Sequence, residues 1–300
     1  FATPYGHGSD TLLGFGPQSS ADQLELEALF KAKLDPADQD RWMQVLTEQP
    51  HHVGSEAGAR YARWIKERFD SWGFDTEIVR YDVSIPFPTY RSVQLTAPEP
   101  FTASLEEAPV AGDPSTQDPK DLLPPYHAFA TEGDVEAELV FVNYGLQEDY
   151  DALARRGISV EGRIVIAKYG RSWRGIKPKL AAERGATRAL IYSDPADDGY
   201  GQGDTYPDGP FKNATGAQRG SVMDLPRRPG DIRTPYVGAR EGVERIPLDE
   251  VETLTPIPVL PLSYADAAPL PQALGGATAP KEWFAQRPFA YHPGPRPARV

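Results

Sequence analysis

The stretch that decides the fold is GRIVIAKYGRSWRGIKPKLAAERGATRALIYSD, residues 162–194. It predicts a strand, a helix and a second strand in succession. Residues 163–169 form a short, β-branched apolar run that is typical of a buried strand. The helix is expected from residue 176 or 177 to residue 184, because Gly185 is a natural stop. Residues 187–192 form the second apolar strand.

The start of this helix carries an unusual charge. Helix starts have partial positive charge and favour Asp or Glu, yet four cations gather here: Arg171, Arg174, Lys177 and Lys179. Such a cluster requires an anionic partner, either acids from elsewhere in the fold or the carboxylate or phosphate of a ligand. Structural ion pairs are common, so internal partners are the first expectation and a ligand site is the alternative.

Composition excludes several classes of protein. The 300 residues suit one large domain or two of ordinary size. A net charge of −12 argues against nucleic acid as a partner. There is no apolar run of about 18 residues and no signal-peptide pattern in FATPYGHGSD at the start. The absence of cysteine excludes disulfides, thiolate metal sites and a cysteine nucleophile, and it is compatible with export.

The chain divides into a helical first part and a strand-rich second part. Residues 1–19 form a loose leader. Helices are expected from Ser20 or Asp22 to about Lys33, from Pro36 onward with Asp35 as cap, and over 56–72 with Ser55 as cap. A strand is expected over 76–85. After Pro86-Phe87-Pro88, strands are expected over 91–96, 137–144 and 257–262, and helices over 149–156 and from Ser263 to about Leu274.

The strand expected over 76–85 has no obvious partner in the chain. Three helices and one strand cannot close a sheet, so this strand requires a sheet to join. We therefore expect the first part to belong to a larger domain whose sheet lies outside these residues. The alternative is a free-standing domain, which would unfold cooperatively by itself.

Residue chemistry alone does not identify a catalytic centre. The histidines are His7, His51, His52, His127 and His292, and none has metal-site spacing. There is no G-x-S-x-G nucleophile elbow and no phosphate-binding glycine loop. The acidic run 194–208 is better explained by turns than by calcium binding. Trp173 beside Arg174 is either a planar wall next to a carboxylate fork or a tryptophan packed under a loop.

Eight sequence blocks occur in an order that resembles one family. They are HVGSE at 52–56, YDV at 81–83, LVFVNYG at 139–145, GRIVIAKYGRSWRGIK at 162–177, LIYSDPADD at 190–198, YPDGP at 206–210, QRGSV at 218–222 and IPVLPLSYADA at 257–267. Over about residues 20–295 the chain resembles the glutamate carboxypeptidase II and transferrin receptor family of zinc exopeptidases.

The resemblance implies a mixed α/β fold with several parts. Residues 20–87 would be the N-terminal segment of an α/β zinc-peptidase domain, and residues 88–290 an inserted, β-rich protease-associated domain that forms a lid. Residues 291–300 would return toward the peptidase domain. The zinc ligands, the general base and a helical domain for homodimerisation would lie beyond this chain.

The resemblance also implies roles for individual residues. Arg174 would bind the C-terminal carboxylate of a peptide substrate, with Trp173 as its aromatic neighbour. Ser221 stands where glutamate-specific members have Asn, which argues against glutamate specificity. Thr234 would contribute to a calcium site. We expect an exported protein that works as part of a zinc carboxypeptidase; a non-catalytic, transferrin receptor-like binding protein is the alternative.

Overall fold

The computed structural model describes residues 11–118, 122–283, 292–295 and 297–300. His7, the first ten residues of the predicted leader, the end of the predicted lid at 284–290 and residues 291 and 296 of the predicted return lie outside them. The chain separates into two compact units, residues 1–72 and 73–300. The domain assignment made from the resemblance, with its boundary at 87/88, remains a prediction.

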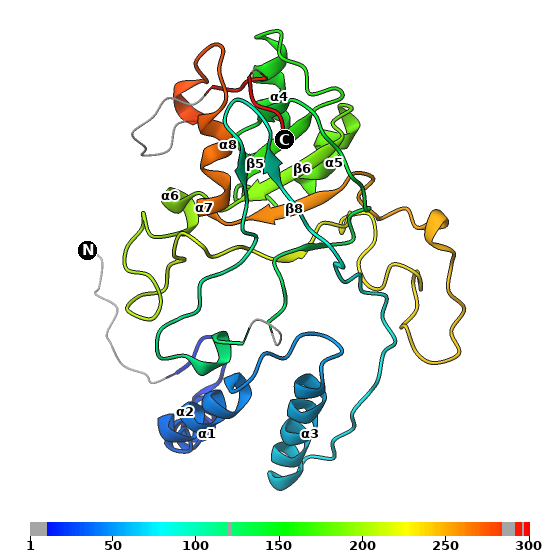
Figure 1. The fold of residues 1–300 in the computed structure, drawn as a ribbon. Coiled ribbons are helices and arrows are strands. Elements are labelled where there is room, and N and C mark those ends of the chain that lie inside the picture. Colours follow the sequence, from blue (N-terminus) through cyan, green and yellow to red (C-terminus); the bar gives the residue numbers. More distant parts are fainter. Residues whose placement is uncertain (1–10, 119–121, 284–291, 296) are drawn as a thin grey trace, which may run out of the picture. The chain divides into compact units, whose positions relative to one another are not determined.

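The described part of the first unit consists of three helices, drawn in blue in Figure 1. They are α1 (Pro17–Ala32), α2 (Pro36–Thr47) and α3 (Glu56–Ser71). The caps of α2 and α3 are as predicted: the Asp35 side chain accepts from the Ala37 N–H, and the Ser55 side chain from the Gly58 N–H. Such side-chain acceptors satisfy amide groups that have no partner within the helix.

Helix α1 begins earlier than predicted. Its N-cap is Gly16, and Pro17 occupies the first helical position, where a missing N–H costs nothing. Ser20 therefore lies within the helix and is buried; its hydroxyl accepts from the Leu12 N–H at 2.9 Å. The apolar side chains of α1 are exposed: Leu24, Leu26, Leu29 and Phe30.

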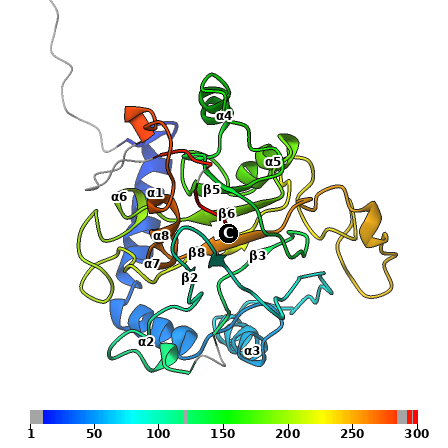
Figure 2. The same ribbon diagram turned by 45° about the horizontal axis from the view of Figure 1, so that its top comes forward.

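The second unit is built on a four-stranded parallel sheet. The strands are β4 (Leu139–Phe141), β5 (Ile164–Lys168), β6 (Arg188–Tyr192) and β8 (Val259–Leu262), paired in that order. Helices α4 (Gln147–Ala154) and α5 (Ile176–Glu183) follow β4 and β5. In both views α4 and α5 lie together beside the sheet, apart from α7 and α8 (Figures 1 and 2). The strand–helix–strand unit of residues 162–194 is thus confirmed, and so is the mixed α/β fold class.

The remaining elements of this unit are short. Strand β1 (Gln94–Leu95) pairs antiparallel with β2 (Phe101–Thr102), and β3 (His127–Ala128) pairs parallel with β7 (Gly220–Ser221). The helices are η1 (Pro114–Thr116), α6 (Pro195–Asp198), η2 (Leu248–Glu250), α7 (Tyr264–Ala267), α8 (Pro269–Gln272) and η3 (Lys281–Trp283). Two short helices replace the single predicted helix after Ser263, because Pro269 and Pro271 interrupt the backbone hydrogen bonding.

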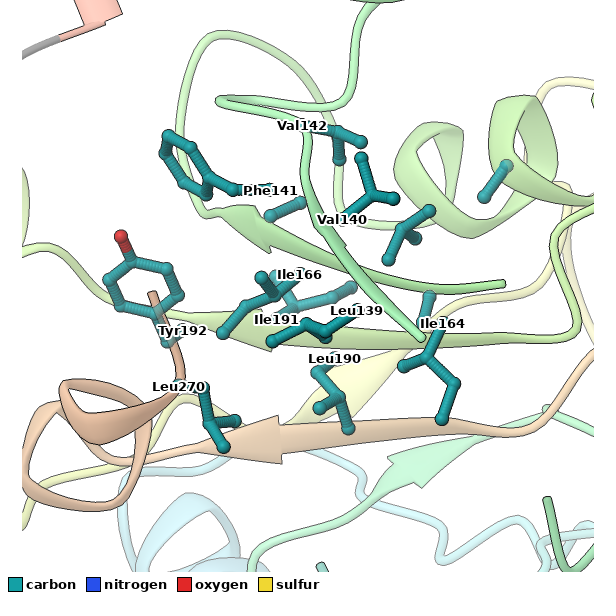
Figure 3. Close-up of a cluster of buried hydrophobic side chains, with 14 of the residues drawn as sticks. Leu139, Val140, Phe141, Val142, Ile164, Ile166, Leu190, Ile191, Tyr192 and Leu270 are labelled. Atoms are coloured by element: carbon teal, nitrogen blue, oxygen red, sulfur yellow. The ribbon is translucent and has the colours of Figure 1, made fainter. Parts of the chain in front are cut away.

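The core of this unit surrounds the parallel sheet. Leu139, Ile164, Ile166, Leu190 and Ile191 are fully enclosed and gather around β4, β5 and β6 in Figure 3. Strands buried on both faces consist of near-continuous apolar runs. This explains why these strands could be recognised from composition.

The strand predicted over 76–85 does not form in this structure, and the expectation that its sheet lies outside these residues remains a prediction. Among the described residues this segment joins no ladder, and its main chain is held at Asp82, whose N–H donates to the Ala239 carbonyl at 2.6 Å, and at Ser84. Apolar side chains remain exposed along it, including Ile78, Val79 and Tyr81. An alternating pattern forms a strand only when a partner strand is present to accept its hydrogen bonds.

No helix in the described ranges combines the length and apolar character needed to span a bilayer.

Candidate functional site

The candidate site lies in the loop between β5 and α5, at the carboxyl end of β5. The strand ends at Lys168, Tyr169 follows, and Gly170 turns the chain with φ of +102°. Trp173 and Arg174 then precede the first residue of α5, Ile176. Loops at the carboxyl ends of parallel strands are common positions for ligand sites. The sequence alone placed the four cations at this point of the fold, and the structure agrees.

Arg174 is half-buried and bonded to neutral oxygens of a single neighbouring segment. Its Nη1 donates to the Ser221 carbonyl at 3.2 Å, and its Nη2 donates to Gln218 Oε1 at 3.0 Å. Its guanidinium carbon lies 5.9 Å from the centre of the Tyr169 ring. Within the described part of the chain no carboxylate forms an ion pair with Arg174. Arginine keeps its proton in proteins, so a full positive charge remains at this position.

Gly220 makes the position of Arg174 possible. Its φ is +135°, and a Cβ built there would lie 2.6 Å from Arg174 Cζ and 2.9 Å from Nη2. Contacts that close do not occur for real side chains, so any other residue would displace the guanidinium. Glycine is thus required both for the backbone conformation and for the close approach of Arg174.

Tyr169 and His127 lie next to Arg174 and were not singled out as site residues by sequence reasoning. The Tyr169 hydroxyl is 2.7 Å from His127 Nε2 and 3.0 Å from the Gln218 carbonyl, and His127 Nδ1 is 3.1 Å from the Gly220 carbonyl. Burial, with a smaller contribution from the charge of Arg174, lowers the pKa of His127 to about 3. Burial also raises the pKa of Tyr169. Both side chains are therefore uncharged at neutral pH.

The two other predicted substrate contacts lie beside Arg174. Trp173 is half-buried, and the ring beneath the guanidinium is that of Tyr169. The Ser221 carbonyl accepts from Arg174, while its hydroxyl accepts from the Met223 N–H at 3.2 Å. The structure thus brings Trp173, Arg174 and Ser221 together, and their roles in binding substrate remain predictions.

The other cations of the cluster are satisfied in different ways. Lys179 forms an ion pair with Asp224 at 2.7 Å, as expected from internal acids. The expectation of a direct acidic partner is wrong for Lys177 among the described residues: its Nζ donates to the carbonyls of Tyr144 (2.6 Å) and Gly170 (2.9 Å), and Asp149 and Asp197 only raise its pKa from a distance. Burial is the main reason that the pKa of Lys177 falls to about 8. Arg171 lies over the Tyr144 ring, 5.1 Å from its centre.

Thr234, the predicted calcium ligand, lies in a different loop. It is buried, and its hydroxyl donates to Asp231 Oδ2 at 3.1 Å. Burial alone would raise the pKa of Asp231, but the N–H groups of Ser84 and Arg233 and the Thr234 hydroxyl lower it overall, with help from Arg245. The carboxylate is thus already occupied by protein donors. The calcium assignment remains a prediction.

The described residues do not fit a catalytic zinc ion. No three His, Asp or Glu side chains converge within the described ranges. A cavity of about 680 Å³ in the second unit is lined partly by Phe87, Phe129, Arg188 and His127, and Arg174 does not line it. Neither a metal centre nor cavity size therefore identifies the site. Among the described residues, the geometry shows a cationic side chain, Arg174, that is held by neutral oxygens.

Comparisons with known proteins identify relatives across nearly the whole chain. No family model matches. A probable glutamate carboxypeptidase from Arthroderma benhamiae is 34% identical over 283 residues, which are 90% of this chain and 38% of that protein. The probable glutamate carboxypeptidase AMP1 of Arabidopsis thaliana is 31% identical over 270 residues, 89% of this chain and 35% of that protein. The chain thus spans less than two fifths of the length of these relatives.

Among solved structures, a zinc aminopeptidase from Bacillus subtilis covers 77% of this chain and 39% of its own, at 16% identity and a TM-score of 0.37. That score is too low to compare the sites. Sequence similarity alone therefore carries the comparison. The chain is a homologue of the glutamate carboxypeptidases over about nine tenths of its length, which confirms the resemblance.

Proposed function

We propose that this chain is part of a zinc-dependent exopeptidase similar to glutamate carboxypeptidase, and that it binds the C-terminal carboxylate of peptide substrates through Arg174. The names of the relatives support a peptidase. The contacts of Arg174 support the choice of this residue as the one that binds the carboxylate. The contribution of the chain is to bind and orient the substrate, since positioning a reactant contributes to the rate separately from the chemical step.

The observation that carries this proposal is the uncompensated charge of Arg174. Its contacts are a carbonyl and an amide oxygen, and both are neutral. Arg184 makes similar contacts, donating to the Leu180 carbonyl and to Gln147 Oε1 above the Tyr150 ring. Arg184, however, caps the C-terminal end of α5, where the helix dipole favours a cation. Arg174 precedes the start of α5, where the dipole opposes its charge, so an anionic ligand would be stabilised there.

The metals and the lid are further parts of the proposal. Zinc would be held by residues outside this chain, as the resemblance implies, and the described residues offer no group of ligands for it. Calcium would involve Thr234. Residues 88–290 would act as a protease-associated lid over the substrate, and homodimerisation would use another part of the protein. We propose an exported location, with which the absence of cysteine is compatible.

The test is peptide hydrolysis by the natural protein that carries this chain. Two substrates are compared, a tripeptide with a free C-terminal carboxylate and the same tripeptide as its C-terminal amide. Arg174→Ala should raise KM for the free acid by about ten- to a hundredfold, the usual loss when a charged hydrogen-bond donor is removed. It should change KM for the amide much less.

The matched control is Arg184→Ala, which removes an arginine from the other end of the same helix. It should leave both KM values unchanged. An unchanged KM for the free acid in Arg174→Ala would remove Arg174 from the binding role. A natural protein that hydrolyses neither peptide would favour the alternative, a non-catalytic binding protein.

A further inference from the structure

Both oxygens that hold Arg174 belong to one short segment of chain, residues 218–221. Gln218 contributes its side-chain oxygen and Ser221 its carbonyl. Only Gly220 and Ser221 of this segment form a strand, β7, which pairs with the two residues of β3. A two-residue ladder fixes a segment weakly. Other contacts must therefore determine where these oxygens lie.

Tyr169 and His127 supply such contacts from below the guanidinium. The Tyr169 hydroxyl lies 3.0 Å from the main-chain carbonyl of Gln218, the residue whose side chain binds Arg174. His127 Nδ1 lies 3.1 Å from the carbonyl of Gly220, the residue over which Arg174 passes. The hydroxyl and the imidazole also contact each other at 2.7 Å. The same tyrosine ring lies beneath the guanidinium.

The protons of this network can be assigned from its acceptors. A nitrogen that faces a carbonyl oxygen must carry a proton, so His127 Nδ1 is the donor to Gly220 and Nε2 of the neutral ring is an acceptor. The Tyr169 hydroxyl has one proton for two acceptors, His127 Nε2 and the Gln218 carbonyl. The Tyr169 hydroxyl therefore couples the His127 ring to residues 218–221, because a shift of either acceptor changes the hydrogen bond to the other.

We propose that Tyr169 and His127 are the positioning residues of the carboxylate site: they fix residues 218–221, and through them the orientation of the Arg174 guanidinium. The inference rests on the proposed function of Arg174. Neither residue touches the substrate in this scheme. Buried polar groups that satisfy one another hold a single arrangement, because any displacement leaves a buried donor or acceptor without a partner.

The test is Tyr169→Phe in the natural protein, with the free-acid and amide tripeptides as substrates. The variant keeps the ring beneath Arg174 and removes only the hydroxyl. KM for the free acid should rise about three- to tenfold, the usual effect of one neutral hydrogen bond. The kcat should stay unchanged, because the carboxylate is bound equally in the ground state and the transition state. The KM for the amide should also stay unchanged, because the amide lacks the carboxylate.

The matched control is Tyr150→Phe. Tyr150 is another buried tyrosine with an arginine over its ring, and its hydroxyl has no hydrogen-bond partner among the described residues. This variant should not alter KM. His127→Asn gives a second, independent variant: it keeps a donor near the position of Nδ1 and removes Nε2, so it should act in the same direction as Tyr169→Phe.

A double variant separates positioning from general damage. In an Arg174→Ala background, Tyr169→Phe should have no further effect on KM, because the group that it positions is gone. If Arg174→Ala raises KM for the free acid while Tyr169→Phe and His127→Asn do not, the positioning role is refuted and the function of Arg174 stands. If Arg174→Ala has no effect, the proposed function fails, and the inference fails with it. Equal effects of Tyr169→Phe in both backgrounds would also refute it.

Discussion

Substitution of Gly220 by alanine should disable Arg174 without touching it chemically. The new Cβ would lie 2.6 Å from Arg174 Cζ, whereas ordinary contacts begin at 3.4 Å, so the guanidinium must move by about 1 Å. Displacements of about 1 Å at a binding group reduce activity by up to about a hundredfold. KM for a peptide with a free C-terminal carboxylate should therefore rise about ten- to a hundredfold in Gly220→Ala.

The substitution also strains the backbone, and a control must separate the two effects. A φ of +135° is unfavourable for alanine, at a cost of about 1–3 kcal/mol in the free energy of unfolding. Gly230 has a φ of +92°, and a Cβ there would meet nothing within 4 Å. Gly230→Ala should thus lose comparable stability in urea denaturation while its KM stays unchanged. The reasoning is refuted if the two variants change KM equally, or if Gly220→Ala leaves KM unaltered.

Three further outcomes follow from burial, from a buried histidine and from a helix cap. Leu190→Ala, at a fully enclosed position of β6, should lower the free energy of unfolding by about 2–5 kcal/mol in urea denaturation; a loss below about 1 kcal/mol would contradict the core assignment. The pKa of His127 is about 3 in the folded chain and about 6.5 when unfolded, so the unfolded chain binds the extra proton and stability falls as the pH drops below about 6.5. Between pH 6.5 and 5 this loss is about 1.6 kcal/mol. His127→Gln should show a smaller loss over the same interval, and an unchanged loss would mean that His127 does not titrate in this way. Asp35→Ala should lower the stability of α2 by about 1 kcal/mol. Amide hydrogen exchange should then become faster in α2, with α3 as the internal control. Equal changes in both helices would refute a local capping role.

The elements that were recognised from the sequence are those whose signals are local. The run 163–169 forms β5 because β-branched residues suit a strand enclosed on both faces, and Gly185 follows the end of α5. The cap Asp35 has its acceptor two residues from the amide that it binds. The strand expected over 76–85 does not form among the described residues, because strand formation depends on a partner strand that a local pattern cannot supply.

The site was predictable in part for the same reason. Arg174 could be identified from a charge that opposes the helix start and from the sequence block around it. His127 and Tyr169 could not, because their importance depends on the pairing of His127 with Gly220, 93 residues away along the chain. A tyrosine at the end of a buried strand was a weak signal, and an isolated histidine gave none. The register of β3 and β7 places His127 opposite Gly220, and Tyr169 reaches the Gln218 carbonyl from the end of β5.

The protonation and pairing of Lys177 and Lys179 explain why an arginine, rather than a lysine, suits position 174. Lys177 is enclosed, and burial is the main reason that its pKa falls to about 8, so it gives up its charge more readily than an exposed lysine. Lys179 keeps its charge by pairing with Asp224. Arg174 neither loses its charge nor pairs with an acid: its guanidinium keeps its proton, and its hydrogen-bond partners are neutral oxygens. A permanent charge held by neutral oxygens at the start of a helix is poorly satisfied until an anion arrives, and a planar carboxylate matches its fork of donors. In the proposed function, the unfavourable charge that first marked residues 171–179 is what would give this site affinity for the C-terminal carboxylate of a peptide.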